Sequence, residues 1–577
     1  MSETTSSRLA GHALVEALVA QGVDTVFGVP GESYLAVLDG LHEHRDQIRF
    51  VICRQEGGAA FMADAHARLT GRPGVCCVTR GPGATNAAIG VHTAFQDSVP
   101  LILLVGQVAS DQRDREAFQE LDYRQVFGPG TLGMAKWVAE VHDANRLPEY
   151  IARAFHVAMQ GRPGPVVLAL PEDLLTTPTT APVLPRVEPA EAWPAPGALR
   201  DLRSRLVAAQ RPFLLVGGHG WTRDSALALR RFAENWQLPV GCAFRFQDTF
   251  DNLHPQYAGD VGIAINPKLA QRIRDEADLV IAVGVRLGEM TTSGYTLLTP
   301  PRPRQVLVHL HPGAEELGRV YTPDIALQAS LSCAGKALES MAAPPQVPWG
   351  AWTAAAHADY EANREHPPVA PLDMAVVIKT IERLVPADTI YTNGAGNYAG
   401  WLHRYLHYRG LALAGKTQLA PTAGSMGYGL PAAVAASLTQ PQRVVINLTG
   451  DGDFLMNGQE LATAMAHGAR RLISIVVDNG SYGTIRMHQE REFPGRVSGT
   501  HLANPDFAAL ARAYGWRAET VGSTEAFEPA LAAALDSGQP SLIHLKLDTD
   551  VSHTRGTLSA IREAALARLA RLARQKP

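Results

Sequence analysis

Short apolar segments alternate with amphipathic helical segments in three successive blocks of this 577-residue chain, and this alternation constrains the fold more than any other feature. Apolar strands separated by helices predict parallel sheets with helices on both faces. At roughly 100–200 residues per domain, the length suits about three such units. The sequence therefore predicts an α/β protein with three doubly wound parallel-sheet domains.

The limits of these units follow from proline-rich segments. Residues 178–196 contain many prolines and are typical of an extended linker, and a second proline-rich segment precedes the third block. We therefore expect an N-terminal domain, a central domain, a C-terminal domain and a helical tail, at residues 7–174, 198–341, 370–550 and 555–577.

Each block contains apolar runs of the length typical of buried strands. The expected strands of the first block are 25–29, 50–53, 74–79, 100–105 and 165–169. Those of the second block are 212–216, 240–242, 279–283 and 305–309, and those of the third are 389–392, 443–448, 472–477 and 541–545. Ligands of such sheets bind beyond the carboxyl ends of the strands.

Composition excludes several classes of function. The net charge is −4 and the basic residues are scattered, so neither nucleic acid nor a polybasic membrane contact is expected. The longest apolar runs are too short to cross a bilayer. The five cysteines form no CxxC pair, and an odd count argues against a disulfide framework, so we expect mostly buried thiols in a reducing compartment. The first residues lack the pattern of a secretory signal, and we expect a cytoplasmic protein.

The third block contains the most specific candidate site. One apolar strand runs into Gly450-Asp451-Gly452-Asp453, and the next ends in Asp478-Asn479-Gly480. Parallel strands end at the same sheet edge, so Asp451 and Asn479 are expected to meet there. Their oxygens suit Mg²⁺ with a diphosphate, and the glycines and the following helix N-terminus suit phosphate. Alone, the tetrapeptide equally fits a turn capped by aspartate; the second strand favours the site.

This two-part pattern resembles the cofactor motif of enzymes that depend on thiamine diphosphate (ThDP). The resemblance implies that Asp451, Asn479 and the backbone carbonyl of Ser481 bind Mg²⁺, whereas many relatives have a small residue at Asp453. It also implies that Met426 is an apolar wedge beneath the cofactor and that the Gly424 carbonyl contacts the aminopyrimidine. The cofactor contacts expected in this block are Gly396, Asn397, Gly424, Met426, Gly450, Asp451, Gly452, Asp453, Asn479, Ser481, Tyr482 and Gly483.

Glu56 is the candidate catalytic carboxylate of the first block. By itself it would suit the N-terminus of a helix. The segments around it, EGGAAFMAD, GRPGV and GPGATN, resemble the acetolactate synthase large subunit. The resemblance implies that Glu56 hydrogen-bonds N1′ of the aminopyrimidine and activates the cofactor, with Pro30, Gly31 and Asn86 nearby. Relatives pair this glutamate with the diphosphate site of a second subunit, so we expect a homodimer or homotetramer.

Other positions bear on the substrate. Gln119, in EAFQELD, resembles a synthase motif and is a candidate contact for a polar substrate group; an ordinary surface or capping glutamine is the alternative. Glu32 stands where synthases usually have glycine, so an ionisable group could alter acceptor choice or proton transfer. His488 stands where synthases commonly have a tryptophan that favours 2-ketobutyrate as acceptor. Arg54-Gln55-Glu56 also replaces the usual Arg-His-Glu.

The central block raises the question of a flavin. Gly217-Gly218-His219-Gly220 and GVRLGEM resemble parts of the synthase flavin site, but His309-Leu310-His311 replaces its Asp-Ile-Asp. A glycine-rich turn alone is weak evidence. FAD, an ADP-like ligand and no ligand are therefore three open alternatives.

The favoured function is an acetolactate synthase-like carboligase, which decarboxylates a 2-oxo acid such as pyruvate and joins the acyl unit to a second carbonyl. A 2-oxo acid decarboxylase or an acyloin lyase of benzaldehyde type, either of which would release an aldehyde, is the alternative within ThDP chemistry. A non-catalytic regulatory or assembly protein is a third hypothesis, against which the intact Glu56, Asp451 and Asn479 argue. The sequence does not name the substrate or decide whether a small regulatory subunit joins.

Overall fold

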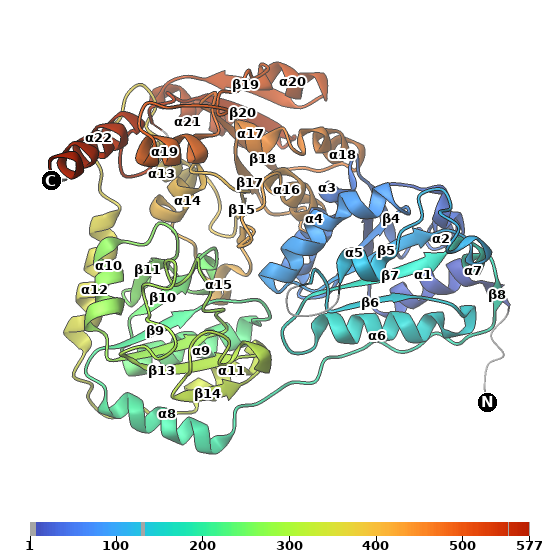
Figure 1. Ribbon diagram of the computed structural model, residues 1–577, viewed down its shortest axis with the longest axis horizontal. Helices are drawn as coiled ribbons and strands as arrows, with labels where there is room; N and C mark the ends of the chain where they lie inside the picture. The colour runs from blue at the N-terminus through green and yellow to red at the C-terminus, as the bar shows by residue number, and fades with distance from the viewer. Residues whose placement is uncertain (1–6, 129–132, 552, 576–577) are drawn as a thin grey trace. The chain divides into compact units, whose positions relative to one another are not determined.

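The described residues form three six-stranded sheets and one short two-stranded pairing (Figure 1). The structure is a computed structural model that describes residues 7–128, 133–551 and 553–575. Residues 1–6 of the expected signal-free N-terminus and 576–577 of the expected tail lie outside this description, as do 129–132 of the first block. The chain divides into two compact parts, one with the N-terminal sheet and the other with the central and C-terminal sheets. All pairings within the six-stranded sheets are parallel, which confirms the predicted fold class.

The N-terminal sheet has the order β3-β2-β4-β5-β7-β6. Its strands are β2 (Thr25–Gly28), β3 (Arg49–Ile52), β4 (Gly74–Val78), β5 (Leu101–Gln107), β6 (Trp137–Glu140) and β7 (Pro165–Pro171). Its helices are α1 (Ala10–Ala20), α2 (Leu35–Glu43), α3 (Glu56–Thr70), α4 (Pro82–Asp97), α5 (Tyr123–Phe127), α6 (Leu147–Met159), α7 (Glu172–Leu175) and the 3₁₀ turn η1 (Glu32–Tyr34). Helices α1, α2 and α6 share one buried cluster with alternate strand residues, while α3 and α4 pack together on the sheet.

The central sheet has the order β11-β10-β9-β12-β13-β14. Its strands are β9 (Pro212–Val216), β10 (Val240–Ala243), β11 (Tyr257–Val261), β12 (Leu279–Val283), β13 (Val306–His311) and β14 (Ile325–Gln328). The helices around it are α8 (Pro196–Ala208), α9 (Arg223–Trp236), α10 (Pro267–Gln271), α11 (Leu331–Glu339), α12 (Gly350–Asn363) and the 3₁₀ turn η6 (Ala314–Glu316). One continuous apolar cluster joins the strands to α8, α9, α11 and α12.

The C-terminal sheet has the order β16-β15-β17-β18-β20-β19. Its strands are β15 (Ile390–Thr392), β16 (Gln418–Leu419), β17 (Val445–Gly450), β18 (Leu472–Asp478), β19 (Arg517–Val521) and β20 (Ser541–Lys546). Its helices are α13 (Met374–Leu384), α14 (Ala399–Tyr405), α15 (Leu411–Ala414), α16 (Gly429–Thr439), α17 (Asp451–Phe454), α18 (Leu461–Ala466), α19 (Gly483–Glu492), α20 (Phe507–Ala513), α21 (Thr524–Ser537) and α22 (Leu558–Gln575). Strands β17 and β18 lie side by side at its centre, so the loops that follow them leave from adjacent points.

The strands expected from the sequence all form, with ends shifted by a few residues. Seven strands were not expected: the short pair β1 (Arg8–Leu9) and β8 (Pro178–Thr179), and β6, β11, β14, β16 and β19 of the six-stranded sheets. Each of them lies at an edge of its sheet. The remaining edge strand, β3, was expected because its apolar run is continuous.

The five cysteine side chains are buried, as expected. Cys76 and Cys77 lie on β4 at 0% exposure, and burial raises the pKa of both thiols, as it does for Cys242 on β10. No helix in the described part of the chain is both long enough and apolar enough to cross a membrane.

Candidate functional site

A cavity of about 210 Å³ opens at the carboxyl edge of the C-terminal sheet. All twelve residues that the sequence nominates in this domain line it: Gly396, Asn397, Gly424, Met426, Gly450, Asp451, Gly452, Asp453, Asn479, Ser481, Tyr482 and Gly483. They come from four loops, after β15, β16, β17 and β18, because parallel strands end on one side. Trp401, Thr484 and Ile485 also line the cavity, and no motif pointed to them.

Asp451 is the first residue of α17 and is buried, at 3% exposure. Its Oδ1 accepts a hydrogen bond from the Gly452 N–H at 2.9 Å. Asn479 follows β18, and its side-chain oxygen accepts the Ser481 N–H at 3.1 Å, which forms a tight turn. Burial raises the pKa of Asp451, because the charged form of the carboxyl group loses its hydration.

A second layer of polar groups holds Asp451. The Asn504 side-chain amide donates to Asp451 Oδ2 and to Asp478 Oδ1, both at 2.8 Å. Asp478 in turn accepts His544 at 2.8 Å and Lys546 at 2.6 Å. Burial alone would raise the pKa of Asp478, but the hydrogen bonds from His544, Lys546 and Asn504 outweigh it and lower that pKa. Asn504 thus fixes the direction of the Asp451 carboxylate, a role the sequence did not reveal.

Asp453 joins two of the four loops. Its carboxylate accepts Thr449 Oγ1 at 2.6 Å, the Tyr398 hydroxyl at 2.8 Å, the Gly427 N–H at 2.8 Å and the Ala395 N–H at 3.3 Å. A Cβ at Gly394 would lie 2.2 Å from Asp453 Oδ1, so only glycine fits there. Four donors occupy this carboxylate, which suits a residue that holds the loops together.

The donor set of the cavity fits Mg²⁺ and a diphosphate. One carboxylate, one amide oxygen and backbone carbonyls are hard oxygen ligands of the kind Mg²⁺ prefers, and phosphate oxygens complete such a set. The glycines after β15, β16 and β17 leave the backbone open to close approach. Asp451, Asn479 and Ser481 would hold the metal.

Glu56 lies at the N-terminus of α3, but it is not the helix cap. The Gln55 side chain caps α3 by accepting the Gly58 N–H at 3.0 Å. Glu56 Oε2 instead accepts the Asn86 side-chain amide at 2.9 Å. A Cβ at Gly83 would lie 3.4 Å from Glu56 Oε1, so this glycine keeps the approach to the carboxylate open. Gln55 is therefore the cap of α3, while Glu56 lies in the first turn, where a carboxylate also suits the helix N-terminus.

The turn that follows β4 gathers the other candidates of the N-terminal domain. Arg80 Nη2 lies 2.6 Å from Glu32 Oε1, and Arg80 Nη1 lies 3.2 Å from Glu172 Oε2. Glu32, on η1, is thus part of an ion pair, and its own side chain is 68% exposed. The preceding Gly31 approaches Thr79 so closely that a Cβ there would lie 2.4 Å from Thr79 Cβ. The loop with Pro30 and Gly31 therefore packs on the turn.

Gln119 lies on the loop between β5 and α5. Its backbone has φ +66°, and a Cβ at Gly81 would lie 2.6 Å from the Gln119 carbonyl oxygen. Its side-chain amide makes no hydrogen bond within the described part of the chain. The neighbouring Phe118 is 74% exposed. Gln119 and Glu56 therefore flank the same turn, at Gly81 and Gly83, and the Gln119 amide is available to a ligand.

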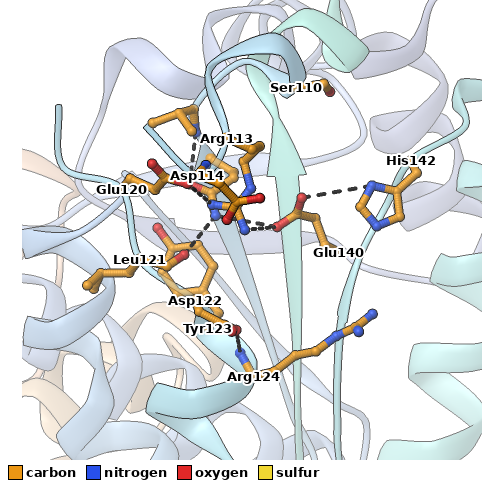
Figure 2. A network of polar contacts seen from close by, with 12 residues as sticks. Ser110, Arg113, Asp114, Glu120, Leu121, Asp122, Tyr123, Arg124, Glu140 and His142 are labelled. Carbon is orange, nitrogen blue, oxygen red and sulfur yellow. Dashed lines mark hydrogen bonds and ion pairs between the residues drawn. The ribbon is translucent and has the colours of Figure 1, made fainter. Parts of the chain in front are cut away.

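A charged network holds this loop (Figure 2). Glu120 accepts the backbone N–H groups of Asp114 at 2.9 Å and Ala117 at 3.0 Å. Arg113 pairs with Glu120 at 2.8 Å and with Glu140, on β6, at 3.2 Å. The pKa of Glu120 is lowered, first by the hydrogen bond from the Asp114 N–H, then by the one from the Ala117 N–H and by the charge of Arg113. The network holds a strained loop, because Asp114, Glu116 and Gln119 all have positive φ.

Replacing Glu120 by glutamine is expected to loosen the loop, because the amide loses the ion pair with Arg113 and one backbone acceptor. The amide hydrogens of Asp114 and Ala117 should exchange faster, and kcat/KM should fall about tenfold, the equivalent of one charge-assisted hydrogen bond. Hydrogen exchange and steady-state kinetics measure the two effects. Glu116→Gln, an exposed change in the same loop, is the control, and equal behaviour of the two variants would contradict the expectation.

His488 is exposed on α19 and does not line the cavity. It lies one helical turn beyond Thr484, which does. Helix α19 packs against the tail helix α22, and Arg562 Nη2 of α22 lies 2.6 Å from the buried Glu490. The tail is therefore a packing helix, as its amphipathic pattern predicts.

The central domain has its own cavity of about 180 Å³. Arg286, His309, Glu316 and Arg319 line it. Burial lowers the pKa of His309, whose Nε2 lies 2.8 Å from the Val285 carbonyl oxygen. Glu316 brings an acidic side chain to the cavity, although His309-Leu310-His311 replaces the acidic residues of the synthase motif. Its carboxylate pairs with Arg286 at 3.4 Å and with Arg319 at 3.2 Å. Charged and polar side chains therefore line much of this cavity, and FAD, an ADP-like ligand and no ligand stay open as alternatives.

Comparison with known proteins places the whole chain in one family. The family described as thiamine pyrophosphate enzyme, another name for ThDP enzymes, matches in its N-terminal TPP binding domain at residues 8–126, its central domain at 199–340 and its C-terminal TPP binding domain at 394–545. The acetolactate synthase isozyme 2 large subunit of Escherichia coli K12 is 34% identical over 93% of this chain and 95% of its own. The acetolactate synthase large subunit of Parasynechococcus marenigrum is 33% identical over 92% and 86%. The mitochondrial acetolactate synthase catalytic subunit of Saccharomyces cerevisiae is 30% identical over 94% and 81%. The chain therefore belongs to the thiamine pyrophosphate enzyme family and is similar, over nearly its whole length, to acetolactate synthase large subunits.

Proposed function

We propose that this ThDP-dependent enzyme is an acetolactate synthase-like carboligase that uses Mg²⁺. It decarboxylates a 2-oxo acid such as pyruvate and joins the remaining acyl unit to the carbonyl carbon of a second molecule. One observation carries the proposal: the twelve residues nominated in the C-terminal domain line one cavity. The similarity to three acetolactate synthases along more than nine-tenths of the chain supports the same reaction class.

The chain's own residues have separate tasks in this proposal. When bound, ThDP supplies a carbon nucleophile and an electron sink. Asp451, Asn479 and the Ser481 carbonyl would hold Mg²⁺, and Asn504 keeps Asp451 in place. Glu56 holds a proton at the aminopyrimidine, and its hydrogen bond from Asn86 fixes the carboxylate.

Two further groups act on the substrate in the proposal. Gln119 presents its unoccupied amide to a polar substrate group. Arg80 forms ion pairs with both Glu32 and Glu172, and its guanidinium offsets the charge of Glu32. Glu32 influences the choice of acceptor as part of this ion pair. His488 is exposed one turn beyond the cavity and has no contact with the described residues that supports a catalytic role, so we propose it only as an outer substrate contact.

The same proposal covers the assembly and the domain limits. We propose domains at 7–174, 198–341 and 370–550, a tail at 555–577, and a homodimer or homotetramer in which Glu56 and the diphosphate site come from different subunits. The buried thiols suit the cytoplasm.

FAD, an ADP-like ligand and no ligand stay the alternatives for the central cavity. Heating the protein releases a bound flavin, so the visible absorbance of the supernatant separates FAD from the other two. Size analysis with and without candidate small subunits decides the assembly.

The deciding experiment incubates the protein with ThDP, Mg²⁺ and pyruvate and measures carbon dioxide, acetolactate and acetaldehyde together. The proposal expects one acetolactate for each carbon dioxide. Acetaldehyde in place of acetolactate would replace the carboligase with a decarboxylase, the alternative that Glu32 and His488 motivate. Tight ThDP binding with no turnover of any 2-oxo acid or acyloin would point to a regulatory or assembly protein.

A further inference from the structure

Arg245 is a buried arginine of the central domain with an unusual backbone. It follows β10 at the carboxyl edge of the central sheet, is 4% exposed and has φ +64°. Few residues other than glycine adopt this conformation, and such outliers cluster at functional sites. Its guanidinium carbon lies 5.0 Å from the centre of the Phe244 ring. The side chain is therefore held in one direction.

That direction leads to the cofactor loops of the C-terminal domain. Arg245 Nη2 donates to the Gly394 carbonyl at 2.8 Å, and Arg245 Nη1 donates to the Pro421 carbonyl. Gly394 belongs to the loop after β15, which contributes Gly396 and Asn397 to the cavity. Pro421 belongs to the loop after β16, which contributes Gly424 and Met426. One guanidinium thus joins two of the four loops around the cavity.

The same two loops are also joined by a carboxylate, which accepts hydrogen bonds where the guanidinium donates them. Asp453 accepts the N–H groups of Ala395 and Gly427, so a carboxylate of the C-terminal domain holds the loops through their donors. Arg245 holds them through their acceptors. The charge of Arg245 also affects His403, on α14. Burial is the larger cause and the charge of Arg245 the smaller one, and together they lower the pKa of His403 to about 3.

We propose that Arg245 is a positioning residue for ThDP: it sets the spacing between the loops at Gly394 and Pro421, and hence the width of the cavity. The inference rests on the cofactor site described above. It gives the central domain a part in cofactor binding that does not depend on whether the central cavity holds a ligand.

The geometry requires arginine. The guanidinium is a planar fork that donates to two carbonyls at once, whereas the lysine ammonium is a single charged point on a flexible stem. Arg245→Lys keeps the charge but cannot span Gly394 and Pro421 in the same way. Arg245→Gln removes the charge as well.

The test is titration calorimetry of the apoenzyme with ThDP at saturating Mg²⁺. Both Arg245→Lys and Arg245→Gln are expected to raise the dissociation constant by about 10- to 100-fold, the range seen when supporting residues of a bound group are lost. At saturating ThDP, the kcat of Arg245→Lys should return close to that of wild type while the KM for ThDP stays raised.

Arg223→Gln is the matched control. Arg223 is also an arginine of the central domain that donates to two carbonyls of the C-terminal domain, those of Ala412 at 3.0 Å and Leu413 at 3.3 Å. These carbonyls belong to α15, which does not line the cavity. This variant should bind ThDP as wild type does.

Three outcomes overturn the inference: wild-type affinity in Arg245→Lys, equal losses in the Arg223 and Arg245 variants, or a kcat that stays low at saturating ThDP. Circular dichroism and the melting temperature of each apoenzyme identify a variant that fails to fold, and Arg245→Lys then carries the test. Absence of ThDP binding by the wild type contradicts the proposed function instead, so the two failures are distinguishable.

Discussion

Replacing Glu56 by glutamine is expected to lower turnover by about 10²- to 10⁴-fold, the usual contribution of one general acid–base group. The amide can still meet the Asn86 side chain, but it cannot hold and return a proton at the aminopyrimidine. Because the residues proposed to hold the metal and the diphosphate line a cavity of the C-terminal domain, the affinity for ThDP should change little. Steady-state rates and calorimetric ThDP titration measure the two quantities separately.

The adjacent residue provides the control for this variant. Gln55→Ala removes the side chain that caps α3, so it should lower the free energy of unfolding by about 0.5–2 kcal/mol and leave turnover largely intact. Comparison of the two variants therefore separates the effect of helix capping on stability from the effect of Glu56 on turnover. A near-normal rate in Glu56→Gln would remove Glu56 from the mechanism.

Replacing Asp451 by asparagine is expected to weaken Mg²⁺-dependent ThDP binding by about 100-fold or more, beyond the loss typical of a supporting residue. The amide is neutral and is a poorer ligand for a hard cation. The fold should persist, because burial already disfavours the charged form of Asp451, whose pKa is raised. Removing this charge also relieves its repulsion with Asp478, so the apoenzyme should not lose stability.

The measurement is the Mg²⁺ dependence of ThDP binding, followed by calorimetry or by tryptophan fluorescence, since Trp401 lines the cavity. Asp548→Asn is the matched control: Asp548 follows Leu547, which lines the cavity, and within the described part of the chain its carboxylate accepts only the Asp550 N–H, at 2.8 Å. Wild-type Mg²⁺ dependence in Asp451→Asn would move the metal site elsewhere.

The central strands could be predicted from the sequence and most edge strands could not. A strand with neighbours on both sides and helices on both faces needs a continuous apolar run, as in β5 and β12, which are buried along their length. An edge strand is half covered, so its apolar run is interrupted by polar residues, as in β19 (RAETV), or is short, as in β14 (IALQ). The pattern of such a segment does not differ from that of a loop.

The site shows the same division. Asp451 and Asn479 could be paired from the sequence because strand order and strand direction alone bring their loops together. That Gln55 caps α3 could not be predicted, because capping depends on side-chain direction; the catalytic role of Glu56 was predicted from the resemblance and stays a prediction. Arg245 and Asn504 gave no signal at all: each acts on residues distant in the sequence, through hydrogen bonds that only the folded chain creates.

The burial of every cysteine has a practical consequence for spectroscopy. A thiol reacts with maleimides and similar reagents as the exposed thiolate, and these thiols are enclosed, with raised pKa values at Cys76, Cys77 and Cys242. The native cysteines should therefore react little with such reagents, and chemical labelling does not require their removal. A single cysteine placed on the surface, for example at the exposed Phe118, would carry a fluorophore or spin label to the loop of Gln119 and report its motion during turnover.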